Sequence, residues 1–272
     1  MSQALYRKYR PETFKHVVGQ EHIVSVLEGA LQQGNVAHAY LFAGSRGTGK
    51  TSIARIVARE IGATANDTYE IDAASNRGID DVRQIRESVH TSPFESKYKV
   101  YIIDEAHMLT KEAWNAFLKT LEEPPEHVVF ILATTELDKV PETVLSRCQV
   151  FQFKKPTRTE LRDVALSISK KEGFTIDNSS AELIALLGDG SFRDTQGILQ
   201  KVLSFSKNKN ITAEEVELVT GAPRGELVNN FVAAVTKLRT HTMTNTQHVV
   251  VACDKKEAAC HFLRSVHVER WC

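Results

Sequence analysis

The fold of this chain is decided by one short stretch, Gly44-Ser45-Arg46-Gly47-Thr48-Gly49-Lys50-Thr51, which follows an apolar run at 39–43 and opens a segment with helical apolar spacing. Glycines let such a loop fold tightly enough to point several backbone N–H groups at phosphate oxygens, and the following helix adds its positive dipole end. In that arrangement the ammonium of Lys50 reaches the β and γ phosphates, and the hydroxyl of Thr51 binds Mg²⁺. A plain glycine-rich turn is the alternative, but the spacing, the Lys-Thr ending and the strand–loop–helix context favour a phosphate-binding loop.

Short apolar runs alternate with helical patterns along the first part of the chain, which predicts a parallel five-stranded sheet flanked by helices, an α/β fold. The runs lie at 39–43, 69–73, 100–104, 128–133 and 149–153. Beyond Pro156 the strand signals stop, and capping boxes at Thr157, Ser179 and Thr212 predict a small three-helix domain. We therefore expect a nucleotide-binding domain at 1–155 and a helical lid at 156–222. In the remainder, 223–272, the apolar spacing predicts one helix at 226–238. We assign the tail that follows it to no domain.

Composition sets limits on partners and location. The chain has 272 residues with 34 Lys plus Arg and 34 Asp plus Glu, so no overall field attracts nucleic acid and any DNA contact must come from a local patch. We find no signal-peptide core and no apolar run of membrane-spanning length, so we expect a cytoplasmic protein without a membrane partner. Four unevenly spaced cysteines, at 148, 253, 260 and 272, indicate neither a disulfide framework nor a standard zinc site.

A second acidic motif completes a candidate nucleotide site. The apolar run at 100–103 ends in Asp104 and Glu105. The carboxyl edge of a parallel sheet is where acids can meet Mg²⁺, so Asp104 is the predicted metal ligand beside Thr51, and Glu105 is placed to polarise the attacking water. Two solvated acids at a strand end are the alternative. Arginine suits the charge on the transferring phosphoryl group, and Arg147 and Arg193 both follow distinctive turns, although either could be a surface arginine paired with an acid.

Together these stretches resemble an AAA+ ATPase, and more narrowly the gamma/tau subunit of the bacterial DNA polymerase III clamp loader. The resemblance covers about residues 3–222 and is carried by the segments 4–11, 17–20, 44–51, 70–76, 104–109, 118–125, 133–136, 146–148 and 190–194. It implies ATP and Mg²⁺ as cofactors. Its implied partners are other clamp-loader subunits in a ring, a sliding clamp that the ring opens, and primer-template DNA.

The resemblance also assigns roles to individual residues. Thr135, or less favourably Thr134, resembles the sensor of the γ phosphate. Arg147 resembles the arginine finger that acts on ATP in the neighbouring subunit. Arg193 resembles the second sensor, which reaches from the lid onto ATP in its own subunit. The residues expected to contact ATP are Tyr9, Arg10, Pro11, Val17, Val18, Gly44, Ser45, Arg46, Gly47, Thr48, Gly49, Lys50, Thr51, Ser52 and Arg193.

Three arginines near a helix start, Arg77, Arg83 and Arg86, either face DNA phosphates or form a solvated helix face. The family usually carries a four-cysteine zinc module after the phosphate-loop helix. Here the segment 61–68 has no cysteine, so we expect no zinc. Of the helical collar through which the family's subunits form a ring, this chain is expected to keep only a remnant, the helix predicted within 223–272, so stable self-assembly is in question.

Other hypotheses remain open. A replication factor C small subunit shares the phosphate loop and the Ser-Arg-Cys motif, but the acid motif and the Ala-Ala-Ser-Asn run favour the bacterial family. The delta-prime subunit resembles a member without a working phosphate loop, whereas the loop here is intact. A module that binds ATP without hydrolysing it is the alternative outside the enzyme class.

Overall fold

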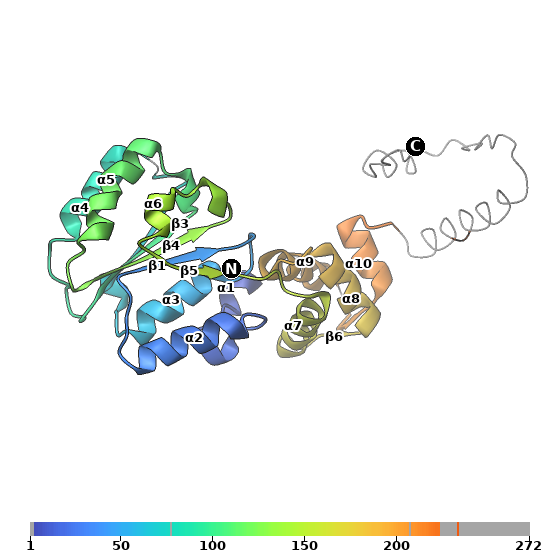
Figure 1. The fold of residues 1–272 in the computed structure, drawn as a ribbon. Coiled ribbons are helices and arrows are strands. Elements are labelled where there is room, and N and C mark those ends of the chain that lie inside the picture. The colour runs from blue at the N-terminus through green and yellow to red at the C-terminus, as the bar shows by residue number, and fades with distance from the viewer. Residues whose placement is uncertain (1–2, 77, 207, 224–232, 234–272) are drawn as a thin grey trace, which may run out of the picture. The chain divides into compact units, whose positions relative to one another are not determined.

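The protein is described here from a computed structural model, which defines residues 3–76, 78–206, 208–223 and 233. Its central element is a five-stranded sheet with the order β2-β3-β4-β1-β5 (Figure 1). The strands are β1 (Ala39–Ala43), β2 (Thr68–Asp72), β3 (Lys99–Asp104), β4 (Val128–Thr134) and β5 (Gln149–Gln152). All neighbours pair in parallel. The five strands and their parallel arrangement confirm the sequence-based prediction, and every predicted strand end lies within one residue of the observed one.

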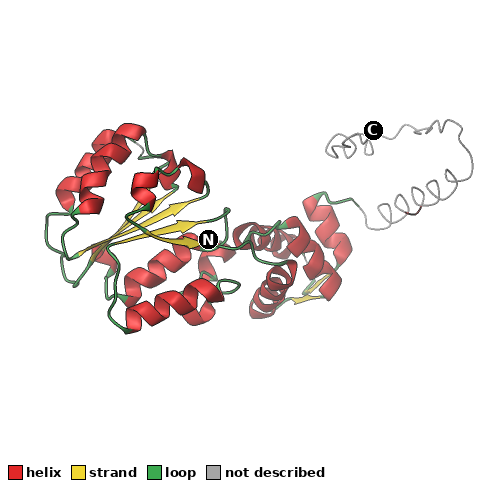
Figure 2. Ribbon diagram, viewed as in Figure 1, coloured by secondary structure: helices red, strands yellow, loops and turns green. Residues whose placement is uncertain are grey.

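The sheet is parallel because its strands are joined by helical crossovers, and helices cover both faces (Figure 2). One face is covered by α4 (Ile79–Ser88), α5 (Lys111–Glu122), α6 (Glu142–Leu145) and the 3₁₀ turn η3 (Ala106–Met108). The other face is covered by α2 (Glu21–Gln32), α3 (Lys50–Glu60) and η1 (Phe14–His16). Because both faces are covered, β1 and β4 are buried along their whole length, which explains their unbroken apolar sequences.

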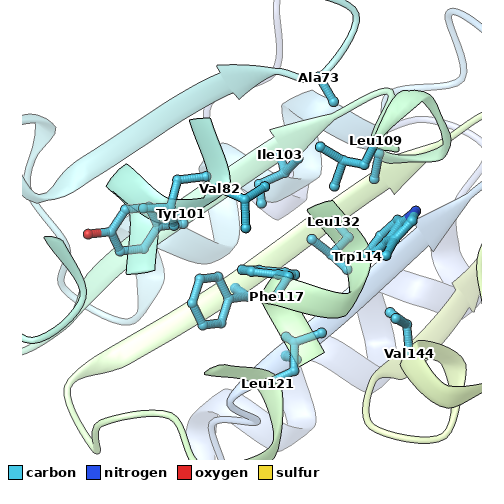
Figure 3. Packing of buried hydrophobic residues seen from close by; sticks show 14 of the residues in the cluster. Ala73, Val82, Tyr101, Ile103, Leu109, Trp114, Phe117, Leu121, Leu132 and Val144 are labelled. Carbon is cyan, nitrogen blue, oxygen red and sulfur yellow. The ribbon is translucent and has the colours of Figure 1, made fainter. Parts of the chain in front are cut away.

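The first of these two cores shows how helical spacing positions the sheet. Trp114, Phe117 and Leu121 project from one side of α5 and pack toward β3 and β4, near Tyr101 and Leu132 (Figure 3). The rings of Phe117 and Phe130 meet edge to face with centroids 4.9 Å apart. This packing fixes β3 and β4, the two strands whose carboxyl ends carry the acidic motif and the Thr-Thr pair.

The helical part after the sheet contains α7 (Arg158–Lys171), α8 (Asn178–Leu187), α9 (Phe192–Phe205) and α10 (Ala213–Thr220). The described residues of this part therefore form four helices, one more than the three predicted. Two short strands, β6 (Thr175–Ile176) and β7 (Asn210–Ile211), pair in parallel between them, although no strand was expected beyond Pro156.

The predicted helix caps of this part are correct in two of three cases. Thr157 and Glu160 form the expected reciprocal capping box of α7, and the side chain of Thr212 accepts from Glu215 N at the start of α10. The prediction for Ser179 was wrong. The carboxylate of Asp177 caps α8 instead by accepting from Ser180 N at 3.0 Å, which places the helix start two residues earlier.

The N-terminal helix α1 (Leu5–Lys8) packs with the helical part, although it belongs to the sequence range predicted for the sheet domain. Leu5 is buried in the core formed by α7 to α10, and its backbone N–H donates to Gln200 Oε1 at 3.1 Å. Tyr9 donates from its hydroxyl to Glu172 on the helical part at 2.5 Å. Leu5 and Tyr9, the latter one of the predicted ATP contacts, are thus held by the predicted lid.

The remaining short elements are η2 (Ala65–Asp67) and η4 (Leu137–Lys139). Residues 1–222 form one compact unit. The helix predicted at 226–238 and the tail lie outside the described residues. In the part of the chain that the structure defines, we find no helix of sufficient length and apolar character to span a membrane.

Candidate nucleotide site

The phosphate-loop candidate connects β1 to α3, as predicted. Its backbone turns sharply because Gly47 and Gly49 adopt positive φ angles of 76° and 99°, a conformation that costs little only for glycine. Gly44 N–H donates to Thr134 O at 3.1 Å, which ties the start of the loop to the end of β4. The loop thereby leads into the N-terminus of an 11-residue helix, where unpaired N–H groups favour an anion.

Lys50, the first residue of α3, lies beneath this loop with only 6% of its surface exposed. Its ammonium donates to Gly44 O at 2.7 Å and to Ser45 O at 2.9 Å. Burial lowers the pKa of Lys50, and the nearby carboxylates of Glu105 and Asp104 partly oppose that shift. The side chain is therefore a positive group held inside the loop by carbonyl oxygens that a phosphate can replace.

The predicted metal ligands lie next to each other. Thr51 Oγ1 donates to Asp104 Oδ2 at 2.9 Å, which joins α3 to the carboxyl end of β3. Oxygen donors of this kind suit Mg²⁺, which usually binds to one or two protein groups plus water and substrate phosphates. The defined residues contain no cluster of three or more His, Cys, Asp or Glu that could hold a metal. Thr51 and Asp104 together offer two oxygen donors of the kind that suits Mg²⁺ bound to a nucleotide.

Glu105 has a left-handed backbone conformation with φ of 50°, which is uncommon for a residue with a side chain and is often found at functional sites. Its carboxylate Oε2 accepts from Thr135 Oγ1 at 3.1 Å. Thr134, the less favoured sensor candidate, is fully buried and accepts a hydrogen bond from Glu136 N instead. Of the two threonines, Thr135 is the one in contact with the predicted catalytic acid.

A cavity of about 530 Å³ lies beside the loop and brings most of the predicted residues together. Its lining includes Tyr9, Arg10, Pro11, Val17, Val18, Arg46, Gly47, Thr48, Gly49, Lys50, Thr51, Ser52, Asp104, Glu105 and Arg193. Gly44 and Ser45 do not line it, and they contribute the carbonyls that hold Lys50. Thr135 and Arg147 are also absent from the lining.

The cavity has a wall that the sequence did not predict. It is formed by one side of α7 and the start of α9, together with Tyr6 of α1, through Val164, Ser167, Ile168, Lys171, Phe192 and Gln196. Arg193 lies on this wall, with its guanidinium carbon 5.1 Å from the centre of the Tyr6 ring. Arg10 also lines the cavity, and burial together with the neighbouring Arg55 lowers its pKa. Arg10, Arg46 and Arg193 therefore line the cavity from three different segments of the chain.

The remaining predicted residues lie away from this cavity. Arg147 follows α6 and pairs with Glu122 of α5, and it also donates to Thr143 O. Arg83 pairs with Asp80 at 2.9 Å on the exposed side of α4, where Arg86 is exposed as well. Arg77 lies outside the described residues. Arg147, Arg83 and Arg86 therefore do not line the cavity beside the phosphate-loop candidate.

Comparison with known proteins assigns the family. A family model described as DNA polymerase III, delta subunit, matches residues 19–76 and 64–157, which together cover just over half of the chain. The chain belongs to this family.

Relatives of the chain agree with the resemblance to gamma/tau subunits. It is 46% identical over 241 residues to DNA polymerase III subunit tau of Bacillus subtilis, covering 81% of this chain and 43% of the relative. It is 42% identical over 237 residues to DNA polymerase III subunit gamma/tau of Mycoplasma pneumoniae, covering 80% of this chain and 35% of the relative. The chain thus spans less than half the length of these two relatives.

Solved structures support the fold. RuvB of Thermotoga maritima, described as a Holliday junction branch migration motor, superposes with a TM-score of 0.66 at 24% identity, covering 78% of this chain and 72% of RuvB. The chain therefore has the AAA+ P-loop fold predicted from its sequence.

Proposed function

We propose that this protein is an ATP-hydrolysing subunit of a bacterial clamp loader, one that helps to open a sliding clamp and load it onto primed DNA. The single observation that carries the proposal is the juxtaposition of Lys50, Thr51, Asp104 and Glu105 at one end of the sheet, within a cavity that a helical wall completes. The similarity to gamma/tau subunits supports the choice of process.

ATP binding depends on groups that the chain already orients. The N-terminus of α3 and the ammonium of Lys50 supply positive charge for the phosphates. Arg193 adds charge from the helical wall, and Tyr9, Pro11, Val17 and Val18 contribute apolar surface to the cavity that suits a base. We expect Lys50 to exchange its bonds with Gly44 O and Ser45 O for phosphate oxygens when ATP enters.

Hydrolysis requires a water placed beside the γ phosphate. Glu105 accepts the proton of that water or polarises it, and Thr135 holds the Glu105 carboxylate through its 3.1 Å hydrogen bond. Thr51 and Asp104 would hold Mg²⁺, which supplies charge neutralisation for the phosphate oxygens when bound. Lys50 and Arg193 stabilise the charge that develops on those oxygens.

Arg147 is proposed to act on the neighbouring subunit's ATP. Its absence from the cavity of its own chain supports a role in trans, and its ion pair with Glu122 must open before it can reach a phosphate. Hydrolysis would then require assembly with other clamp-loader subunits. Arg83 and Arg86, which are exposed on α4, remain candidates for contacts with primer-template DNA.

The test is a comparison of Glu105→Gln with the parent protein. In the complex with partner subunits, clamp and primed DNA, we expect this substitution to lower ATP turnover by about a hundred-fold or more while ATP binding persists, because it removes the base and leaves the phosphate contacts. Glu112→Gln, an exposed carboxylate at the start of α5, is the matched control and should have no effect. ATP binding without turnover in both Glu105→Gln and the parent would support an ATP-binding module that does not hydrolyse. Equal and substantial turnover in the two proteins would exclude Glu105 as the catalytic base.

A further inference from the structure

His107 lies at the centre of a charged network behind the proposed catalytic acid. It is part of η3, two residues after Glu105, and only 6% of its side chain is exposed. Its Nδ1 lies 3.1 Å from Thr134 Oγ1 and 3.5 Å from Glu105 Oε2, and its Nε2 lies 3.2 Å from Glu136 Oε1. Among the residues that the structure describes, these are the polar side chains in contact with the ring: Glu105 just before η3, Thr134 at the end of β4 and Glu136 in the segment after β4.

The hydrogen bonds of Thr134 determine the direction of its hydrogen bond with the His107 ring. The hydroxyl of Thr134 donates its only proton to Glu136 O at 3.1 Å and accepts from Glu136 N at 3.0 Å. It can therefore offer Nδ1 only a lone pair, so Nδ1 must donate. Nε2 faces a carboxylate oxygen, which also accepts. The ring of His107 thus lies between the carboxylates of Glu105 and Glu136 and contacts both.

The network continues away from the cavity. Glu136 also pairs with Lys139 of η4 at 2.8 Å through its second oxygen. A continuous series of side-chain contacts therefore runs from Glu105 through His107 and Glu136 to Lys139. This series connects the residue after β3 to the segment after β4, and the segment leads into α6.

We propose that His107 is a positioning residue for Glu105. Thr135 Oγ1 and the Nδ1 side of the His107 ring both contact Oε2 of Glu105, and Glu136 contacts the Nε2 side of the ring. The carboxylate of Glu105 is thereby presented to the cavity in one orientation. This inference rests on the proposed function, in which Glu105 acts on the attacking water.

The structure separates this role from nucleotide binding. Glu105 lines the cavity, whereas neither His107 nor Glu136 does. A residue that acts only by orienting the catalytic acid should change kcat while leaving KM and the dissociation constant for ATP unchanged. A residue that merely supports the fold should lower thermal stability and ATP affinity along with kcat.

The experiment compares steady-state ATPase kinetics of variants assembled with partner subunits, clamp and primed DNA. We expect His107→Ala to lower kcat by about ten-fold or more, because misplaced catalytic groups commonly cost factors of this size, with KM and ATP affinity within two-fold of the parent. Glu136→Gln leaves the imidazole in place and removes its anchoring charge at a partly exposed residue, so we expect a smaller decrease in kcat of about three-fold. Asp138→Asn alters a neighbouring exposed acid that does not contact the ring, and it should behave as the parent.

Two outcomes would overturn the inference. Either kcat stays within two-fold of the parent in both His107→Ala and Glu136→Gln, or ATP affinity falls in proportion to kcat. Glu105→Gln in the same series separates this failure from that of the proposed function. If Glu105→Gln abolishes turnover while both other variants stay active, only the role of His107 is wrong. If Glu105→Gln turns over ATP like the parent, the proposed function is wrong as well.

Discussion

Replacing Gly47 by alanine should test the contact between the phosphate loop and the helical wall. Gly47 has φ of 76°, and its carbonyl accepts from Phe192 N at 3.0 Å at the start of α9. A Cβ built on Gly47 would lie 2.0 Å from Ser191 Oγ and 3.0 Å from Ser191 Cβ. Ser191 is buried and caps α9 by accepting from Asp194 N at 3.2 Å. The methyl group cannot enter without moving this cap.

The expected cost has three sources. The left-handed conformation costs an alanine about 1–2 kcal/mol. Displacing Ser191 weakens a helix cap worth about 1 kcal/mol, and separating the two segments loses the Phe192 N to Gly47 O hydrogen bond, worth about 1 kcal/mol. We therefore expect Gly47→Ala to lower the free energy of unfolding by about 3–4 kcal/mol.

Urea unfolding of the nucleotide-free protein measures this loss. Gly62→Ala is the matched control, since Gly62 has φ of 85° but open space where its Cβ would lie. It should lose only the conformational cost of about 1–2 kcal/mol. Adding Ser191→Gly to Gly47→Ala removes the clashing atoms and should recover part of the difference. Equal destabilisation by Gly47→Ala and Gly62→Ala would refute the contact argument.

Three further predictions concern other parts of the molecule. Lys50→Ala should lower ATP affinity by about a hundred-fold, because it leaves phosphate charge uncompensated in a half-enclosed site, and parent-like affinity in calorimetry would exclude this site. Arg147→Ala should bind ATP as the parent does and lose the turnover stimulated by assembly, so full activity would exclude a role in trans. Burial raises the pKa of Asp67, but N–H groups of Glu95, Phe94 and Ser96 outweigh it and lower the pKa from 3.8 to about 2. Its contribution to stability is thus present above about pH 4 and lost as the pH falls toward 2. Unfolding of Asp67→Asn should lack that pH-dependent component, and an unchanged pH profile would contradict it.

The sequence predicted the sheet and the phosphate loop because both leave strong local patterns. Buried parallel strands are continuously apolar, and the loop needs glycines and a Lys-Thr pair at fixed spacing. The helix start at Asp177 was missed because Asp177 and Ser179 are both good cap residues, and spacing alone does not choose between them.

Long-range packing explains what sequence reasoning did not find. The contact of Leu5 with Gln200 spans 195 residues, so no local pattern assigns α1 to the helical part. The wall of the cavity made by Val164 and Ile168 has ordinary amphipathic spacing, which predicts burial but not what lies opposite. No local pattern predicts the contact between His107 and Glu136 either, because His107 follows β3 and Glu136 follows β4.

The most direct test of the account is ATP turnover per subunit across a concentration series, with the cognate clamp and primed DNA present. If neighbours supply Arg147, the rate per subunit should rise with protein concentration and then reach a plateau. A rate per subunit that is substantial and independent of concentration, and that survives Arg147→Ala, would contradict the account, because it would show that this chain hydrolyses ATP alone.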